Sequence, residues 1–143
     1  MTADPLFYEQ SITFLYTDDL ERHAAFYRDV MGLKLVLEQS VAKIFQWTPT
    51  SFLGVCDKEG RPRGNKGIML TFLVEDAQAT YDRLLERGVV FDEPLEARGG
   101  YNLRSAFFRD PEGYVLEIQE FMDPRWPYPD GRKPRAIAAD PAE

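Results

Sequence analysis

The sequence is poor in the residues that form disulfides and metal centres. Its 143 residues include one cysteine, Cys56, and one histidine, His23. A lone cysteine cannot form an internal disulfide bond, which is typical of proteins in a reducing cytoplasm. No apolar run approaches the roughly 18 residues of a membrane helix, and the first eight residues lack the features of a secretory signal. We therefore expect a cytoplasmic protein without a membrane partner.

Positive charge is also scarce. The chain has 17 Lys and Arg against 24 Asp and Glu, a formal net charge of -7. A protein that binds nucleic acid non-specifically needs a basic surface to neutralise phosphates, so we expect no nucleic-acid partner. The sequence also lacks a phosphate-binding glycine loop, a Ser or Cys nucleophile motif and zinc-type Cys/His spacing.

The chain reads as two similar halves joined by a polar, glycine-rich segment at residues 57–67. Both halves carry Phe-Leu-x-x-Asp, ending at Asp18 and Asp76, where an aspartate can cap a following helix. Gly32 and Gly88 are typical helix stops. The strands predicted from β-branched and aromatic content are residues 11–17, 33–38, 41–47 and 52–56, and then residues 68–74, 89–91, 102–109 and 114–121. This pattern indicates a duplicated βαβββ module, at about residues 8–57 and 67–121.

The last 22 residues differ from the rest. Five of the ten prolines lie after residue 121, and the four basic residues there balance four acidic ones. We expect residues 1–121 to form a single domain and residues 122–143 to form an extended arm or a disordered tail. Because the segment contains Trp126 and Tyr128, packing of an arm on a partner subunit is the alternative.

Two motifs, together with the paired modules, carry a family resemblance. They are Asp19-Leu-Glu-Arg-x-x-x-Phe26-Tyr27-x-x-x-Met31-Gly32 and Phe108-Arg-Asp-Pro-Glu-Gly-Tyr-Val-Leu-Glu117. From about Gln10 to Phe121 the chain resembles the vicinal oxygen chelate superfamily, which includes glyoxalase I, extradiol dioxygenases, fosfomycin-resistance enzymes and bleomycin-resistance proteins. The resemblance implies an α+β fold in which two βαβββ modules form curved mixed sheets, with helices outside and a concave ligand cleft inside.

The resemblance also identifies the positions of metal ligands in metal-dependent members. These members place His or Gln on the first strand, Glu or His on the last strand of the first module, and His and Glu on the first and last strands of the second. The residues here are Ile12, Gly54 or Val55, Met69 and Glu117. Because a catalytic divalent ion needs about three N or O ligands, we expect no metal cofactor. The alternative is one divalent ion held by Gln10, Glu117 and a displaced side chain.

Strand alternation predicts which side chains line the cleft. With Glu117 facing inward, Leu116 and Ile118 pack against a helix, and Ala42 and Ile44 lie under the other helix. His23 is expected on the outer helical layer, exposed or half-buried. The predicted ligand-binding residues are Gln10, Ile12, Phe14, Tyr16, Phe45, Trp47, Met69, Thr71, Tyr101, Arg104 and Gln119.

Glu117 is the candidate catalytic residue. Because burial disfavours the charged form of a carboxyl group, Glu117 could act as a general base or as the counter-ion of a cationic ligand. The alternative is a structural ion pair with Arg104 or Arg98.

The cleft is mainly apolar and aromatic, which suits a small organic ligand. We therefore expect a homodimer that binds a small, partly apolar or aromatic molecule without a metal, similar to bleomycin-resistance-type sequestration. Three alternatives remain. They are a glyoxalase- or dioxygenase-like lyase or oxidoreductase with a divalent metal, a metal-free enzyme using Glu117 as base, and a regulatory domain with a vestigial cleft.

Overall fold

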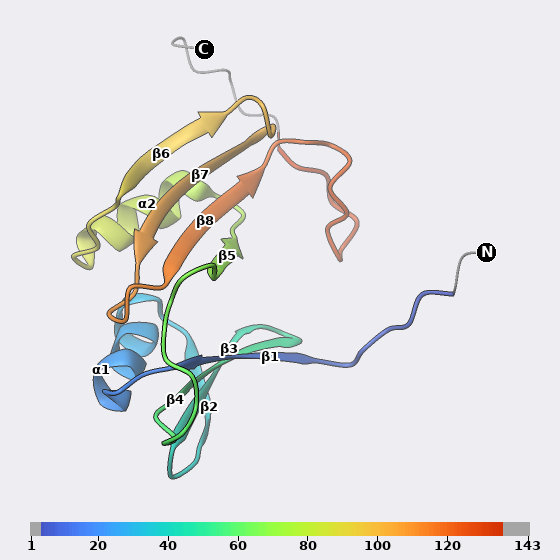
Figure 1. The fold of residues 1–143 in the computed structure, drawn as a ribbon. Coiled ribbons are helices and arrows are strands. Elements are labelled where there is room, and N and C mark those ends of the chain that lie inside the picture. The colour runs from blue at the N-terminus through green and yellow to red at the C-terminus, as the bar shows by residue number, and fades with distance from the viewer. Residues whose placement is uncertain (1–3, 136–143) are drawn as a thin grey trace. The chain divides into compact units, whose positions relative to one another are not determined.

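The computed structural model describes residues 4–135 and contains two compact units, Met1–Gly64 and Asn65–Glu143. Each unit has the element order strand, helix and three strands (Figure 1). The predicted α+β class and the duplicated βαβββ module are confirmed. The assignment of residues 1–121 to a single domain remains a prediction. No helix among residues 4–135 has the length and apolarity needed to cross a membrane.

The first unit contains a four-stranded mixed sheet in the order β1-β4-β3-β2. Strand β1 pairs in parallel with β4, and the other pairs are antiparallel. Helix α1 runs directly into a short π-helical segment, η1, and both lie between β1 and β2 in the chain. The bounds are β1 Ser11–Tyr16, α1 Leu20–Ala25, η1 Phe26–Val30, β2 Lys34–Glu38, β3 Ala42–Thr48 and β4 Ser51–Cys56.

The second unit repeats this topology with the order β5-β8-β7-β6. Strand β5 pairs in parallel with β8. Strand β7 pairs antiparallel with β8 on one side and with β6 on the other. The bounds are β5 Met69–Leu73, α2 Ala77–Glu86, β6 Glu93–Arg98, β7 Leu103–Arg109 and β8 Val115–Phe121. In both sheets the first and last strands of the module lie side by side and parallel.

Aspartates begin both helices. Asp76 caps α2 by accepting a hydrogen bond from the Ala79 N–H at 3.1 Å, as the sequence predicted. The predicted cap of α1 is wrong by one residue, because Asp19 and not Asp18 accepts from the Arg22 N–H. Two adjacent aspartates satisfy the capping pattern equally well, so the sequence could not distinguish them.

The core of the first unit lies between its sheet and the α1–η1 helix. Phe45, Leu53 and Leu15 are fully buried there, and the Phe45 ring lies 6.5 Å from the Tyr27 ring. His23 is also fully buried, with its ring 5.4 Å from that of Tyr27. The expectation of an exposed or half-buried His23 was therefore wrong. His23 lies four residues before the buried Tyr27, and residues four apart share one face of a helix.

The second unit packs α2 against its own sheet. Leu84 of α2 is buried, as are Leu116, Ile118 and Phe108 of the strands. Phe91, in the loop after α2, packs its ring against that of Phe108 in a tilted arrangement, with the ring centroids 5.1 Å apart. This loop is where the sequence predicted a strand at residues 89–91.

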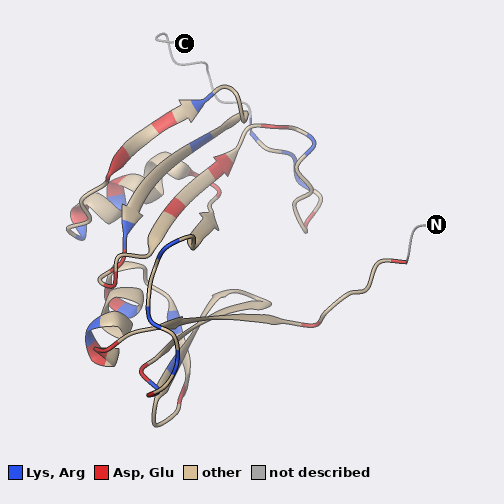
Figure 2. Ribbon diagram, viewed as in Figure 1, with Lys and Arg blue, Asp and Glu red and all other residues tan. Residues whose placement is uncertain are grey.

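The strand predicted at residues 89–91 is instead β6, Glu93–Arg98. This strand lies at the edge of the sheet, pairs only with β7 and contains Pro94. Figure 2 shows charges of both signs along it. An edge strand tolerates proline and charge, so its sequence lacks the apolar alternation by which strands are recognised.

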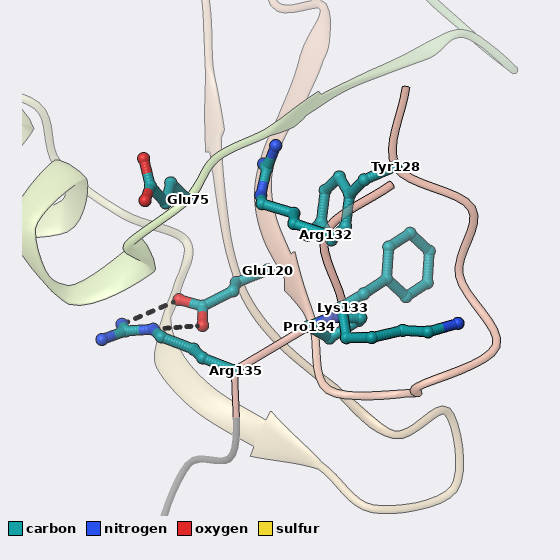
Figure 3. A pocket seen from close by; sticks show the side chains of 8 residues that line it. Glu75, Glu120, Tyr128, Arg132, Lys133, Pro134 and Arg135 are labelled. Atoms are coloured by element: carbon teal, nitrogen blue, oxygen red, sulfur yellow. Dashed lines mark hydrogen bonds and ion pairs between the residues drawn. The ribbon is translucent and has the colours of Figure 1, made fainter. Parts of the chain in front are cut away.

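The C-terminal segment 122–135 packs on the second unit (Figure 3). The Trp126 ring stacks 4.1 Å from Phe121, the last residue of β8. Arg135 forms a bidentate ion pair with Glu120, at 2.8 and 3.1 Å. Residues of this segment therefore contact β8 of their own chain. The extended arm or disordered tail expected at residues 122–143 stays a prediction, and residues 136–143 lie outside the described residues.

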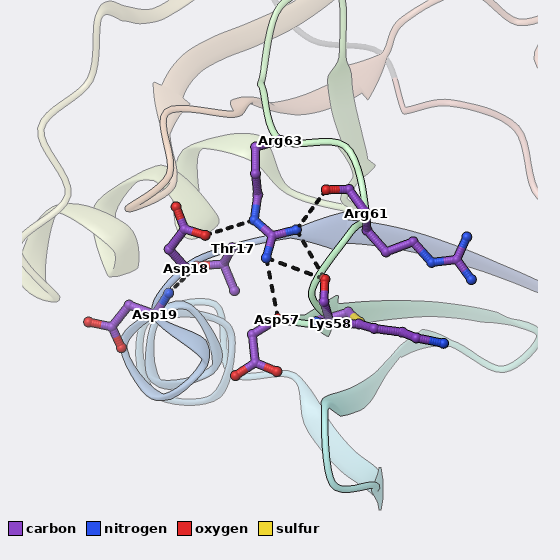
Figure 4. A network of polar contacts seen from close by, with 8 residues as sticks. Thr17, Asp18, Asp19, Asp57, Lys58, Arg61 and Arg63 are labelled. Atoms are coloured by element: carbon purple, nitrogen blue, oxygen red, sulfur yellow. Dashed lines mark hydrogen bonds and ion pairs between the residues drawn. The ribbon is translucent and has the colours of Figure 1, made fainter.

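The loop after β4 folds back onto the first unit through one arginine. Arg63 donates to the Asp18 carboxylate at 2.8 Å and to the carbonyls of Asp57, Lys58 and Arg61 (Figure 4). One guanidinium therefore binds three backbone carbonyls of a segment whose composition indicates only a polar linker.

Candidate functional site

The candidate site is the face of the second sheet that α2 leaves uncovered. Thr71, Glu117 and Phe107 are paired across β5, β8 and β7, and Gln119 pairs with Ser105. Directly paired residues point to the same side of a sheet, so these five side chains share one face. The intervening residues of β8 and β7 supply the core against α2.

This face carries a pocket of about 470 Å³. Of the residues predicted from the sequence, Glu117 lines it together with Met69, Tyr101 and Gln119. Five lining residues were missed: Glu93, Arg98, Leu103, Ser105 and Phe107. Leu103, Ser105 and Phe107 lie at alternate positions of β7. The inward and outward alternation that was applied to β8 would have identified them if it had also been applied to β7.

Glu117 is the buried acid of this pocket. It is 6% exposed, and the Thr71 hydroxyl donates to its carboxylate at 2.6 Å. The Gln119 amide nitrogen, turned toward Glu117, donates at 3.1 Å to either oxygen. Within residues 4–135, no lysine or arginine forms an ion pair with Glu117. Its carboxylate is thus held by neutral donors, and its negative charge has no cationic partner among the described residues.

Arg98, one of the two expected partners of Glu117, is engaged elsewhere. Its guanidinium donates to Ser105 at 3.1 Å, bonds to Glu96 and lies 3.9 Å from Glu93. It also sits over the Phe107 ring, 5.5 Å from the centroid. Two carboxylates therefore balance Arg98, and the residue forms a wall of the pocket.

The other sequence-predicted residues of the second unit are placed differently. Arg104 pairs in register with Glu120, which bonds to the first N–H of α2, so Arg104 lies on the helix face of the sheet. This is opposite to the expected face, because Arg104 occupies an even position in a strand whose odd positions line the pocket. Tyr101, 76% exposed, lies at the rim in the turn between β6 and β7.

In the first unit, Ile12, Phe14 and Tyr16 share the face of β1 opposite to the buried Leu15. Ile12 and Phe14 remain 48% and 42% exposed. Phe14 covers Gly54, since a Cβ there would lie 2.5 Å from the ring. Gln10 is exposed just before β1.

The face predicted for Phe45 is wrong, since the residue is fully buried and its ring packs near Tyr27. Ala42 and Ile44 consequently occupy the other face of β3, and not the face under the helix. Trp47 is half-buried at an irregularity in the β3–β4 pairing. Apolar residues occur at both odd and even positions of this strand, so alternation could not decide its orientation.

The residues at the family's metal-ligand positions do not fit a catalytic divalent ion. Ile12, Gly54 or Val55, and Met69 have no side-chain nitrogen or oxygen, and the Glu117 carboxylate accepts from Thr71 and Gln119. Among residues 4–135, no group of three or more His, Cys, Asp or Glu side chains is arranged to hold a metal ion. A tetrahedral catalytic zinc site would require three protein ligands.

Comparison with known proteins supports the fold. A model of the Glyoxalase/Bleomycin resistance protein/Dioxygenase superfamily matches residues 10–118. A probable lactoylglutathione lyase of Vibrio cholerae serotype O1 is 29% identical over 121 residues, covering 74% of this chain and 86% of that protein. The uncharacterized protein YraH of Bacillus subtilis is 26% identical, with coverages of 76% and 94%.

Solved structures show the same architecture. The crystal structure of a lactoylglutathione lyase from Agrobacterium tumefaciens superposes with a TM-score of 0.67 at 24% identity, covering 81% of this chain and 95% of that one. At this identity the likeness establishes the fold, and function has to be argued from the residues of the site.

Proposed function

Since the chain belongs to the Glyoxalase/Bleomycin resistance protein/Dioxygenase superfamily, we propose that it binds a small, partly apolar or aromatic organic molecule without a metal ion. The observation that carries this proposal is Glu117, a carboxylate that is 6% exposed in the pocket of the second sheet and has only neutral donors. A ligand with a hydrogen-bond donor would complete its coordination.

The size and lining of the pocket support this proposal. A volume of about 470 Å³ lies within the roughly 300–1,000 Å³ typical of small-molecule sites. Met69, Leu103 and Phe107 offer apolar surface, and the exposed Tyr101 ring stands at the rim. Apolar burial would supply affinity, and the few polar groups would orient the ligand.

The donor set supports binding without a metal. Of the positions that hold the ion in metal-dependent relatives, only Glu117 has an oxygen ligand to offer, and Thr71 donates to it at 2.6 Å. We therefore propose that Glu117 contacts the ligand directly.

We also propose a cytoplasmic homodimer. The single cysteine, Cys56, is buried and free, which suits a reducing compartment. Phe7 and Tyr8, which precede β1, and Ile12 and Phe14 within it are exposed, and exposed apolar surface favours association. Sedimentation equilibrium would test the assembly, and a monomer at all concentrations would contradict it.

A metal-free enzyme is the second candidate. The lyase name of the Vibrio cholerae relative and the position of Glu117 favour it, because a buried carboxylate in a pocket can act as a general base. Such an enzyme would exchange an acidic C–H proton of its ligand for deuterium in D₂O. Glu117→Gln should abolish that exchange while largely retaining binding, whereas equal loss of both would count against catalysis.

Binding can be tested with benzyl alcohol, whose ring fits the apolar lining and whose hydroxyl can donate to Glu117. We expect saturable shifts of the Ser105 and Phe107 amide signals in NMR titrations. Glu117→Leu should weaken binding about tenfold, the value of one hydrogen bond to a charged group. The control Glu86→Leu changes an exposed acid at the end of α2.

Two results would contradict the proposal. Equal affinities of the wild type and Glu117→Leu would exclude the role of Glu117. Loss of binding on addition of a chelator would show that a metal ion is required.

A further inference from the structure

We propose that the ligand is amphoteric, with a basic nitrogen that pairs with Glu117 and an oxyanion that pairs with Lys66 and Arg109 at the other end of the same face. This inference rests on the proposed function and names the chemical class of its ligand. It derives from a second hollow that adjoins the pocket.

The second hollow has a volume of about 400 Å³. Met69 lines both it and the Glu117 pocket, so the two hollows meet at this side chain. The remaining lining residues are Asn65, Lys66, Gly67, Ile68, Arg109 and Val115. Together the two hollows give a longer binding surface than the pocket alone.

The strand register gives the spacing between the rows that hold Glu117 and Arg109. Met69, Val115 and Arg109 are paired across β5, β8 and β7 and form one row. Glu117 belongs to the next row on the same face, two residues further along β8. Residues two apart on a strand are roughly 7 Å apart. A ligand that bridges the rows therefore needs a short spacer between its charged groups.

The charges at the two ends are opposite and incompletely balanced. Glu117 has no cationic partner among residues 4–135, and in the same part of the chain Lys66 forms no ion pair. Arg109 is held by Asp92 at 3.3 Å and by the Gly113 carbonyl at 2.9 Å. Figure 2 shows basic residues in the segment that leads into β5 and acidic residues on β8. One end thus retains a negative charge and the other a positive charge.

The surface between these ends is apolar. Met69, 53% exposed, and Val115 lie in the row of Arg109, and Phe107 flanks Glu117 in the next row. An aromatic or short aliphatic spacer would cover this surface. A ligand with two positive groups would place one of them against Lys66 and Arg109, and a ligand with two negative groups would place one against Glu117. This repulsion would favour ligands that carry one charge of each sign.

Three matched probes test the proposal by NMR titration of the full chain. Para-(aminomethyl)benzoate carries both charges on a rigid ring, benzylamine carries only the amine, and para-toluate carries only the carboxylate. We expect the amphoteric probe to bind at least threefold more tightly than either of the others at low ionic strength. The advantage over benzylamine should shrink in high salt, because the charge of the exposed Lys66 is screened.

Two variants separate the ends of the site. Lys66→Met should weaken para-(aminomethyl)benzoate and para-toluate about threefold and leave benzylamine unchanged. Glu117→Gln should weaken the two amines and leave para-toluate unchanged. Lys133→Met is the control, because Lys133 is an exposed lysine that lines a different hollow.

The outcomes distinguish this proposal from the one on which it rests. If benzylamine binds as tightly as the amphoteric probe and Lys66→Met has no effect, the amphoteric class is wrong, while binding at Glu117 stands. If no probe binds in a way that depends on Glu117, both proposals are overturned.

Discussion

Replacing Glu120 by alanine should destabilise the second unit strongly, although the residue lies outside the ligand pocket. Glu120 is 1% exposed at the end of β8 (Figure 3). Its carboxylate accepts from the Ala77 N–H, the first of α2, at 2.8 Å and from Arg135 at 2.8 and 3.1 Å. The side chain therefore joins a strand, a helix terminus and the C-terminal segment.

The magnitude follows from these contacts. Leaving the buried Ala77 N–H without an acceptor costs about 1–3 kcal/mol, and losing a negative charge at a helix N-terminus costs about 0.3–1 kcal/mol. Relief of the buried charge offsets part of this. We expect Glu120→Ala to lower the free energy of unfolding by about 2–3 kcal/mol.

Urea unfolding followed by the fluorescence of Trp126 would measure this change. Trp126 stacks on Phe121 in the second unit, and Trp47→Phe would remove the other tryptophan. Glu75→Ala is the matched control, because Glu75 is an exposed acid that borders the same hollow, and it should change stability by less than about 0.5 kcal/mol. Equal effects of the two alanine variants would refute the reasoning.

Three further predictions concern the core, a turn and a helix cap. Phe45→Ala should cost about 3–5 kcal/mol in urea unfolding, since the ring is fully buried; a cost below about 1 kcal/mol would contradict its placement in the core. Gly113→Ala should cost about 1–2 kcal/mol by the same assay, because Gly113 has φ +84° and a Cβ would meet the Asn65 amide; an unchanged midpoint would count against this turn geometry. The hydrogen bond from the Ala79 N–H, followed by the charge of Arg135, lowers the pKa of Asp76. The ionised Asp76 carboxylate therefore stabilises the fold fully above the ordinary aspartate pKa, and this stabilisation is lost as pH falls through the lowered pKa. Asp76→Asn should therefore flatten the acid dependence of unfolding, and an unaltered pH profile would exclude this contribution.

Much of the fold follows from local sequence features. Asp76 and Gly88 bound the second helix, and the apolar run from Ile68 predicts β5 to within one residue at each end. Repetition of the same pattern in both halves strengthened each assignment, because independent local signals agreed on one topology. Only β6 was misplaced among the strands. Its sequence, with Pro94 and three charged residues, suits a sheet edge and lacks alternation.

The candidate site was less accessible from the sequence. Glu117 and Gln119 follow from alternation on a single strand, and they line the pocket together. Arg98 was considered only as a partner of Glu117, because nothing local shows that it bonds to Ser105 and Glu96. The orientation of Phe45 depends on the register of a strand that is apolar on both faces. Such features are set by tertiary packing, which single-sequence patterns do not encode.

The composition of β6 has a consequence for crowded solutions of the protein. The outer rim of this strand offers backbone groups to any neighbouring molecule, yet Pro94 removes one N–H from the strand and Glu93 and Glu96 flank it with carboxylates. A strand from another copy would find an incomplete ladder and charge repulsion there. The proline and the carboxylates of β6 therefore protect this rim from sheet-to-sheet aggregation.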